Sequence, residues 1–232
     1  MASEDITCFV GYVASGANQV ETFRSRFAIR IFKREQLPFN SVESDKLSLR
    51  SYDTRDDDAI WSLHEWAIQE TGVNPADVPG TEDLRTVETA YLETGGAFVV
   101  GTVDSEQPQD SQSNVTEQSP YTRSDLATHD GLLVAMGGIL PNQAGHSDER
   151  DRPGAAELHR MRVAPTYQRR GYGKQILSEL ERRAAGGGFE TLLATTSTRQ
   201  SAAVEFYSER GYEQTGTSAA GSYELVHFEK QL

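Results

Sequence analysis

The chain has 232 residues, of which 37% are hydrophobic, so it fits one ordinary domain or one domain with extensions. Its 22 Lys and Arg against 35 Asp and Glu give a net charge of −13, which argues against a nucleic-acid or anionic-membrane binder. The single cysteine, Cys8, excludes an internal disulfide and a cysteine-built zinc site, and no apolar run approaches the ~20 residues of a membrane span.

Residues 1–40 are expected to be a poorly defined N-terminal extension. They begin with acidic residues where a secretory signal is basic, so we expect a cytoplasmic protein. Ile29 and Ile31 alternate with Arg30, a pattern that fits an edge strand or a basic arm, and a loosely ordered extension is the plainer alternative. The folded domain is expected over residues 41–232.

Two strands and two helices are expected between residues 46 and 103. Alternating apolar residues over 47–52 predict a strand with one buried face. A helix is predicted over 57–72, because carboxylates in its first turn suit the positive helix end and Pro75 follows it. A second helix is predicted over 81–95, followed by a buried strand over 97–103.

Residues 104–130 have no periodic apolar pattern. A polar stretch of that length exceeds most connections inside a compact domain, so we expect a disordered insertion there.

Further strands are predicted at 132–140, 157–163, 192–194 and 223–226, and helices at 171–185 and 201–210. This order predicts a mixed α/β fold whose helices cover both faces of one sheet.

The stretch 158–174 contains a strand, a short loop and the start of a helix. Gly171 and Gly173 allow the backbone to approach a ligand, and the free N–H groups of the first helical turn point outward at the positive end of the helix dipole. Such a loop binds phosphate or pyrophosphate, and its basic side chains add positive charge. A Walker A loop is excluded because Gln175 follows Lys174, and the dinucleotide fingerprint needs a third glycine.

The charge is unevenly distributed along the chain. Residues 41–152 contain seven basic and 22 acidic residues, a net charge of −15, whereas residues 153–232 contain ten basic and nine acidic residues, a net charge of +1. An acidic surface of the kind found in salt-adapted proteins explains this distribution. Alternatively, the acidic half faces a cationic substrate while the C-terminal half holds an anionic cofactor.

The stretch 158–174 resembles the corresponding part of the GNAT superfamily of acyl-CoA-dependent N-acyltransferases. Residues 168–173, Gln-Arg-Arg-Gly-Tyr-Gly, meet the family's phosphate-loop pattern Q/R-x-x-G-x-G/A. The preceding strand is followed by Pro165, and residues 203–212 are close to the family's ending A-x-x-x-Y-x-x-x-G-F/Y. The resemblance is specific over 155–213 and is topological over 46–103 and 131–140.

The resemblance implies acetyl-CoA as co-substrate, without a metal. It implies a GNAT-type α/β domain with a mixed, mostly antiparallel sheet that is flanked by helices and splayed at the cofactor-binding strand near Val163. Backbone groups of Met161 and Val163 are expected to bind the pantetheine arm, and the loop amides the pyrophosphate. The implied cofactor-binding residues are Met161, Arg162, Val163, Gln168, Arg169, Arg170, Gly171, Tyr172, Gly173, Lys174 and Gln200, the last at a position where relatives often carry Asn.

Two catalytic residues are implied. Tyr207 matches the family tyrosine, and a phenol with a pKa near 10 can protonate a departing thiolate whose own pKa is about 8.5. Packing beside Phe206 is the alternative for Tyr207. Glu157 lies six residues before Val163 and is expected to share its strand face and to take a proton from the acceptor ammonium. A solvated carboxylate or a substrate-binding anion are the alternatives for Glu157.

The function expected from these residues is N-acetyl transfer. An acetyl group would pass from acetyl-CoA to a primary amine of a small molecule or a protein, by direct attack in a ternary complex. The expected partner is this amine acceptor, with no nucleic acid and no membrane, and a homodimer stays open. The alternative is a non-catalytic acyl-CoA sensor or an interaction module with the same fold.

Overall fold

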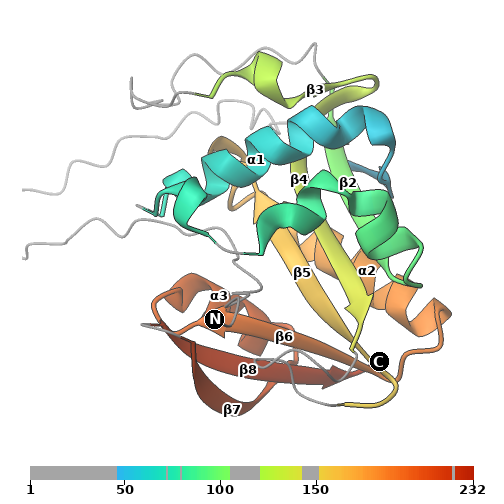
Figure 1. The fold of residues 1–232 in the computed structure, drawn as a ribbon, viewed down its shortest axis with the longest axis vertical. Coiled ribbons are helices and arrows are strands. Elements are labelled where there is room, and N and C mark those ends of the chain that lie inside the picture. Colours follow the sequence, from blue (N-terminus) through green and yellow to red (C-terminus); the bar gives the residue numbers. More distant parts are fainter. Residues whose placement is uncertain (1–45, 72, 79, 105–120, 143–151, 221–222) are drawn as a thin grey trace, which may run out of the picture.

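The computed structural model describes residues 46–71, 73–78, 80–104, 121–142, 152–220 and 223–232. They form one eight-stranded sheet in the order β1-β2-β4-β5-β6-β8-β7, with β3 paired to β4 (Figure 1). Only β5 and β6 pair in parallel, so the sheet is mixed and mostly antiparallel, as predicted. The expected extension, residues 1–40, and residues 105–120 of the expected insertion lie outside the described residues.

Four antiparallel strands build the first part of the sheet: β1 (Ser48–Ser51), β2 (Ala97–Val103), β4 (Gly131–Pro141) and β5 (Ala155–Val163). Strands β2, β4 and β5 are buried over most of their length, because helix α1 (Asp57–Gln69) covers one face and helix α2 (Tyr172–Gly186) covers the other (Figure 1). Burial on both faces explains the nearly continuous apolar sequence of β2 and β4.

Two neighbouring glycines of β4 show how closely the two layers approach the sheet. A Cβ atom at Gly137 would collide with Met161 Sδ and with Ile176 of α2. A Cβ atom at Gly138 would collide with the rings of Tyr91 and Phe98 on the opposite face. These positions therefore accept only glycine without rearrangement of the core.

The second part of the sheet diverges from the first. Strand β5 pairs with β6 (Thr191–Ser197) only through Ala155–Glu157 and Thr191–Leu193, and the two strands then separate like the arms of a V (Figure 1). The sheet continues with β8 (Tyr223–Gln231) and the edge strand β7 (Glu213–Ala220). Helix α3 (Ser201–Glu209) follows β6. This geometry confirms the predicted splay, but the strands part at Glu157, before Val163, where the splay was expected. We call Glu157 the vertex of the splay.

A bulge in β5 changes which side chains share a face. Arg160 has φ 53°, an unusual backbone conformation for a non-glycine residue, and the register against β4 shifts between Met136 and Gly138. The Arg160 guanidinium is buried and ion-paired with Asp83, with Nε 2.9 Å from Oδ2. This buried contact holds the strained residue in place.

The segment 81–95 is not the continuous α-helix that its apolar spacing predicts. It forms a 3₁₀ turn, Thr81–Arg85, and a π-helical turn, Glu88–Leu92, separated by Thr86 in a non-helical conformation. Asp83 receives hydrogen bonds from Arg160 and from the Tyr91 hydroxyl. The ion pair with β5 thus competes with regular helix geometry, and no local sequence pattern reveals it.

Residues 121–130, expected inside the disordered insertion, are folded. They form a 3₁₀ turn, Arg123–Leu126, with a Thr122–Asp125 capping box, and the short strand β3 (Ala127–Thr128). Leu126 is 1% exposed, and Asp130 pairs with Arg50 at 2.6 Å. One buried leucine and one ion pair anchor the segment. The mostly polar composition of residues 104–130 hides these two contacts, which is why disorder was expected there.

Strand β7 was also not predicted. Its residues, Glu213 to Ala220, are small or polar, and among the described residues β7 lies at the sheet edge and pairs with β8 alone. Within the described part of the chain, no helix combines the length and apolarity that crossing a membrane requires.

Candidate active site

The loop between β5 and α2 has the backbone that its glycines predict. Arg169 has φ 60° and Gly171 has φ 83°, and Gly171 caps the 15-residue helix α2. A Cβ atom at Gly171 would have no heavy atom within 4 Å, so the space in front of the helix N-terminus is open. The first N–H groups of α2 and the positive end of its dipole face this space, which suits an anion.

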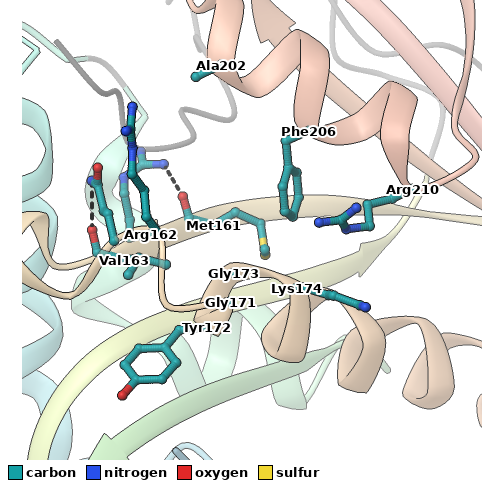
Figure 2. Close-up of a pocket in the computed structure, with 12 residues that line it drawn as sticks. Met161, Arg162, Val163, Gly171, Tyr172, Gly173, Lys174, Ala202, Phe206 and Arg210 are labelled. Atoms are coloured by element: carbon teal, nitrogen blue, oxygen red, sulfur yellow. Dashed lines mark hydrogen bonds between the residues drawn. The ribbon is translucent and has the colours of Figure 1, made fainter. Parts of the chain in front are cut away.

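A cavity of ≈ 330 Å³ lies between this loop, the end of β5 and helix α3 (Figure 2). Nine of its lining residues belong to β5, the loop and the first turn of α2, and all nine were predicted: Met161, Arg162, Val163, Gln168, Arg169, Gly171, Tyr172, Gly173 and Lys174. The other three come from one side of α3 and from the residue that caps its C-terminus: Ala202, Phe206 and Arg210. The structure therefore brings most of the predicted cofactor-binding residues together around one pocket.

The three α3 residues were missed, although their spacing carried a signal. Ala202, Phe206 and Arg210 are each four positions apart, so they lie on one helix face. The Phe206 ring is close to Gly173, where a Cβ atom would lie 3.7 Å away, and the Arg210 guanidinium lies 5.3 Å from the Phe206 ring. Arg210 brings a fourth cationic side chain to the pocket lining, beside Arg162, Arg169 and Lys174.

The end of β5 presents one edge to the pocket. Its other edge pairs with β4 through Met136↔Arg162 and Ala135↔Val163, whereas pairing with β6 stops at Glu157. Two backbone carbonyl groups near the pocket accept hydrogen bonds from side chains. Arg162 Nη1 donates to Met161 O at 2.8 Å, and Gln168 Nε2 donates to Val163 O at 3.3 Å (Figure 2). A ligand that accepts or donates along this edge would replace or extend these local bonds.

Two predicted cofactor-binding residues do not line the pocket. Arg170 turns back, donating to Thr166 O at 3.3 Å and lying 5.0 Å from the Tyr167 ring. Gln200 is 5% exposed at the start of α3, and its Oε1 accepts a hydrogen bond from Thr196 Oγ1 at 2.8 Å. A direct contact of either side chain with a ligand stays a prediction that this geometry does not favour.

The Tyr207 side chain is buried in the core rather than exposed to the pocket. It is 0% exposed, and its ring packs 5.3 Å from Tyr212, 5.5 Å from Phe206 and 5.6 Å from Phe228. Tyr207 is one position beyond Phe206, which does line the pocket. The ring of Tyr207 therefore packs beside Phe206, as the structural alternative expected. The catalytic role of its hydroxyl group stays a prediction.

Glu157 does not share the strand face of Val163, contrary to the expectation from their six-residue spacing. A Cβ atom at Gly173 of α2 would lie 3.7 Å from Val163 Cγ2, whereas the ring of His159, two residues after Glu157, contacts Tyr91 on the opposite face. The bulge at Arg160 reverses the alternation between them. Glu157 therefore points to the face opposite α2.

The Glu157 carboxylate lies at the vertex of the splay. It is 5% exposed and accepts hydrogen bonds from Thr195 Oγ1 at 3.0 Å and from Asn142 Nδ2 at 3.4 Å. Because β5 and β6 separate beyond this residue, the V-shaped opening begins beside its carboxylate. In the described residues, no three His, Cys, Asp or Glu side chains gather as around a metal ion.

Comparison with solved structures supports the fold. An acetyltransferase of the GNAT family from Staphylococcus aureus Mu50 aligns with a TM-score of 0.56 and 14% identity, covering 81% of this chain and 99% of the other. YncA of Salmonella typhimurium, solved with its cofactor acetyl-CoA, aligns with a TM-score of 0.55 and 16% identity, covering 80% and 94%. A ribosomal-protein-alanine N-acetyltransferase from Brucella melitensis gives 0.55 and 17%, covering 80% and 99%.

Comparison with sequences identifies the family. No curated protein matches the chain in sequence. The family model described as "Acetyltransferase (GNAT) family" matches residues 87–212, more than half of the chain, and these residues include the phosphate loop, the vertex of the splay and helix α3. Together with the splayed sheet and the pocket at the start of α2, this match shows that the chain belongs to the GNAT family of acetyltransferases.

Proposed function

We propose that this protein transfers an acetyl group from acetyl-CoA to a primary amine of a small molecule or a protein, by direct attack in a ternary complex. The observation that carries the proposal is the pocket between β5, the phosphate loop and α3. Its open space before Gly171, its helix N-terminus and its four cationic side chains suit the negative charge of a pyrophosphate.

Different pocket residues would bind different parts of acetyl-CoA. Loop amides from Arg169 to Lys174 would bind the pyrophosphate, supported by the side chains of Arg169, Lys174 and Arg210. The edge of β5 at Met161 and Val163 would bind the pantetheine arm in place of the missing β6 neighbour. Its thioester supplies the activated acetyl group. Phe206 and Met161 would flank the arm with apolar surface.

Two side chains would handle protons. The acceptor enters from the face opposite α2, and Glu157, directly or through water, takes the proton of its ammonium group. The free amine attacks the thioester carbonyl carbon and forms the carbon–nitrogen bond, the carbon–sulfur bond breaks, and the sulfur leaves as a thiolate. The acetylated nitrogen releases its second proton to solvent and becomes the amide. Tyr207 would donate a proton to that thiolate. The acidic segment 41–152, with net charge −15, would raise the local concentration of cationic acceptors.

Tyr207 also motivates a second candidate function. Because its ring is fully buried and does not line the pocket, the geometry is compatible with a protein that binds acyl-CoA as a sensor without turnover. The two functions share the pocket and differ in chemistry. They are therefore separated by activity rather than by affinity.

A thiol-release assay with acetyl-CoA tests the proposal. The acceptor panel should cover polyamines, amino acids, aminoglycosides, and peptides with a free N-terminus or lysine. Release of thiol together with a product whose mass has increased by one acetyl group supports the transferase. Tight binding of acetyl-CoA, without acetylated product from any class in the panel, favours the sensor.

A further inference from the structure

Four polar side chains form a hydrogen-bonded row across the second part of the sheet. Glu157 of β5, Thr195 of β6, His227 of β8 and Ser218 of β7 are linked in that order. Thr195 Oγ1 lies 3.0 Å from Glu157 Oε1 and 3.1 Å from His227 Nδ1, and His227 Nε2 lies 2.8 Å from Ser218 Oγ. We call these four residues the polar row.

The polar row lies on the sheet face opposite α3. Thr196, the neighbour of Thr195, points the other way and bonds Gln200 at the start of α3. Phe228, the neighbour of His227, packs on Tyr207 of α3. Because side chains alternate along a strand, Thr195 and His227 face away from α3, on the same side as the Glu157 carboxylate that they contact.

Packing alone does not require polar residues here. Glu157 is 5% exposed, Thr195 7% and His227 5%, and burying such groups is unfavourable unless they are hydrogen-bonded. On the same face, Leu193 is 0% and Leu225 is 2% exposed, so apolar side chains fit the neighbouring positions of β6 and β8. Packing therefore does not account for the polar side chains of the row.

The direction of the hydrogen bonds follows from counting hydrogens. The Thr195 hydroxyl has one hydrogen, and it donates this hydrogen to Glu157. The Thr195 oxygen must then accept from His227, so Nδ1 of the imidazole carries a hydrogen. When the ring is neutral, Nε2 is the acceptor and Ser218 is its donor. The imidazole is thus held in its Nδ1–H form.

We propose that Thr195 and His227 are positioning residues for Glu157, which fix its carboxylate at the vertex of the splay. This inference rests on the proposed function, in which Glu157 takes the proton of the acceptor. Neither residue touches a reactant: Thr195 orients one carboxylate oxygen, and His227 orients Thr195. The other carboxylate oxygen accepts from Asn142 at the longer distance of 3.4 Å, so Thr195 makes the tighter contact.

Substitution of Thr195 tests the positioning role by kinetics. Thr195→Val keeps the shape and removes the hydroxyl, and we expect kcat to fall about tenfold or more while the dissociation constant of acetyl-CoA stays unchanged. Thr195→Ser should restore most of the activity. Thr191→Val is the matched control, because Thr191 is a buried threonine of β6 on the same face that bonds Gln231 at 3.0 Å. Equal kcat in Thr195→Val and Thr191→Val would overturn the proposal.

Nitrogen NMR of the imidazole tests the contact without relying on activity. In the wild type at pH 8, we expect hydrogen on Nδ1 of His227, with the signal assigned through its loss in His227→Gln. In Thr195→Val, the hydrogen should move to Nε2, which can donate to Ser218. Hydrogen on Nε2 alone in the wild type would overturn the proposed direction of the row. A protein that shows Nδ1–H but no acetyl transfer would instead reject the proposed function and leave the contact standing.

Discussion

Individual residues of the site differ in how far their role follows from the sequence. The phosphate-loop glycines act through the backbone, and local backbone geometry is what a short motif encodes. Glu157 depends on a bulge at Arg160 that no motif records, so its spacing from Val163 predicted the wrong face. Arg210 lines the pocket, although it occupies a variable position of the family's ending over residues 203–212. Side-chain direction is therefore the part of the site that the sequence encodes least visibly.

Tyr207 gives the first prediction. If its hydroxyl protonates the departing thiolate, Tyr207→Phe should lower kcat by about 10²-fold, with little change in acetyl-CoA affinity, because the hydroxyl matters only as charge develops on sulfur. Steady-state kinetics and calorimetry measure the two quantities. Tyr212→Phe is the matched control: it lies in the same ring cluster, and its hydroxyl donates to Glu181 at 3.2 Å, away from the pocket. Equal kcat in both variants would remove Tyr207 from the mechanism.

Glu157 gives the second prediction, which concerns the pH dependence of the rate. If Glu157 is the base, Glu157→Gln should depress the rate most at low pH, where the acceptor amine is almost entirely protonated. At high pH the defect should shrink, because free amine becomes plentiful. The pH profile of kcat/KM for the acceptor measures this. A defect that is constant across pH, with a raised acceptor KM, would assign Glu157 to substrate binding.

His64 gives a prediction about stability. It is 1% exposed on α1, and neither ring nitrogen has a hydrogen-bond partner among the described residues. Burial, followed by the charges of Arg162 and Arg160, lowers the pKa of His64 to about 2. The unfolded chain takes up this proton below a pH of about 6.5 while the folded chain does not, so His64 reduces stability as the pH falls from there.

Replacing His64 removes that dependence. Between pH 6 and pH 4.5, the wild type should lose up to about 1.4 kcal/mol of unfolding free energy per pH unit more than His64→Gln does. Urea unfolding at several pH values measures the difference. Parallel stability curves for the two proteins would show that His64 titrates normally in the folded state.

At the level of elements, periodic apolar patterns predicted most of the structure. Strands β2, β4, β5 and β6 and all three helices were found close to the predicted ranges, because each buries a regular apolar face. The elements that failed depend on distant partners. The 81–95 segment is divided by an ion pair to β5, residues 121–130 are anchored by Leu126, and β7 is a polar edge strand.

Leu126 tests the anchoring of its segment. The side chain is 1% exposed in the main hydrophobic core, so Leu126→Ala should lower the unfolding free energy by about 2–4 kcal/mol through lost burial and a residual cavity. Leu92→Ala is the control, because Leu92 is 38% exposed and should cost far less. Chemical unfolding measures both variants. Equal and small losses would mean that residues 121–130 contribute little to the fold.

At the scale of the whole molecule, the main feature is a sheet whose two parts diverge. Its two parts are joined through three residues of β5 and three of β6, and beyond them the end of β5 lines the pocket at the start of α2. The C-terminal part carries the phosphate loop and α3, whereas the acidic segment 41–152 contributes α1 and the first strands. This division agrees with an anionic cofactor on one side and a cationic acceptor on the other.

Calorimetric titration with acetyl-CoA tests the central claim, that the start of α2 binds its pyrophosphate. Gly171→Glu places a side chain and a negative charge in the open space before the helix, and its affinity should fall at least about tenfold, or about 1.4 kcal/mol. Gly188→Glu is the control, because Gly188 also has positive φ and open surroundings but follows the other end of α2. Wild-type affinity in Gly188→Glu with weakened binding in Gly171→Glu is the predicted result. Equal affinity in two folded variants would contradict the assignment of this pocket to acetyl-CoA.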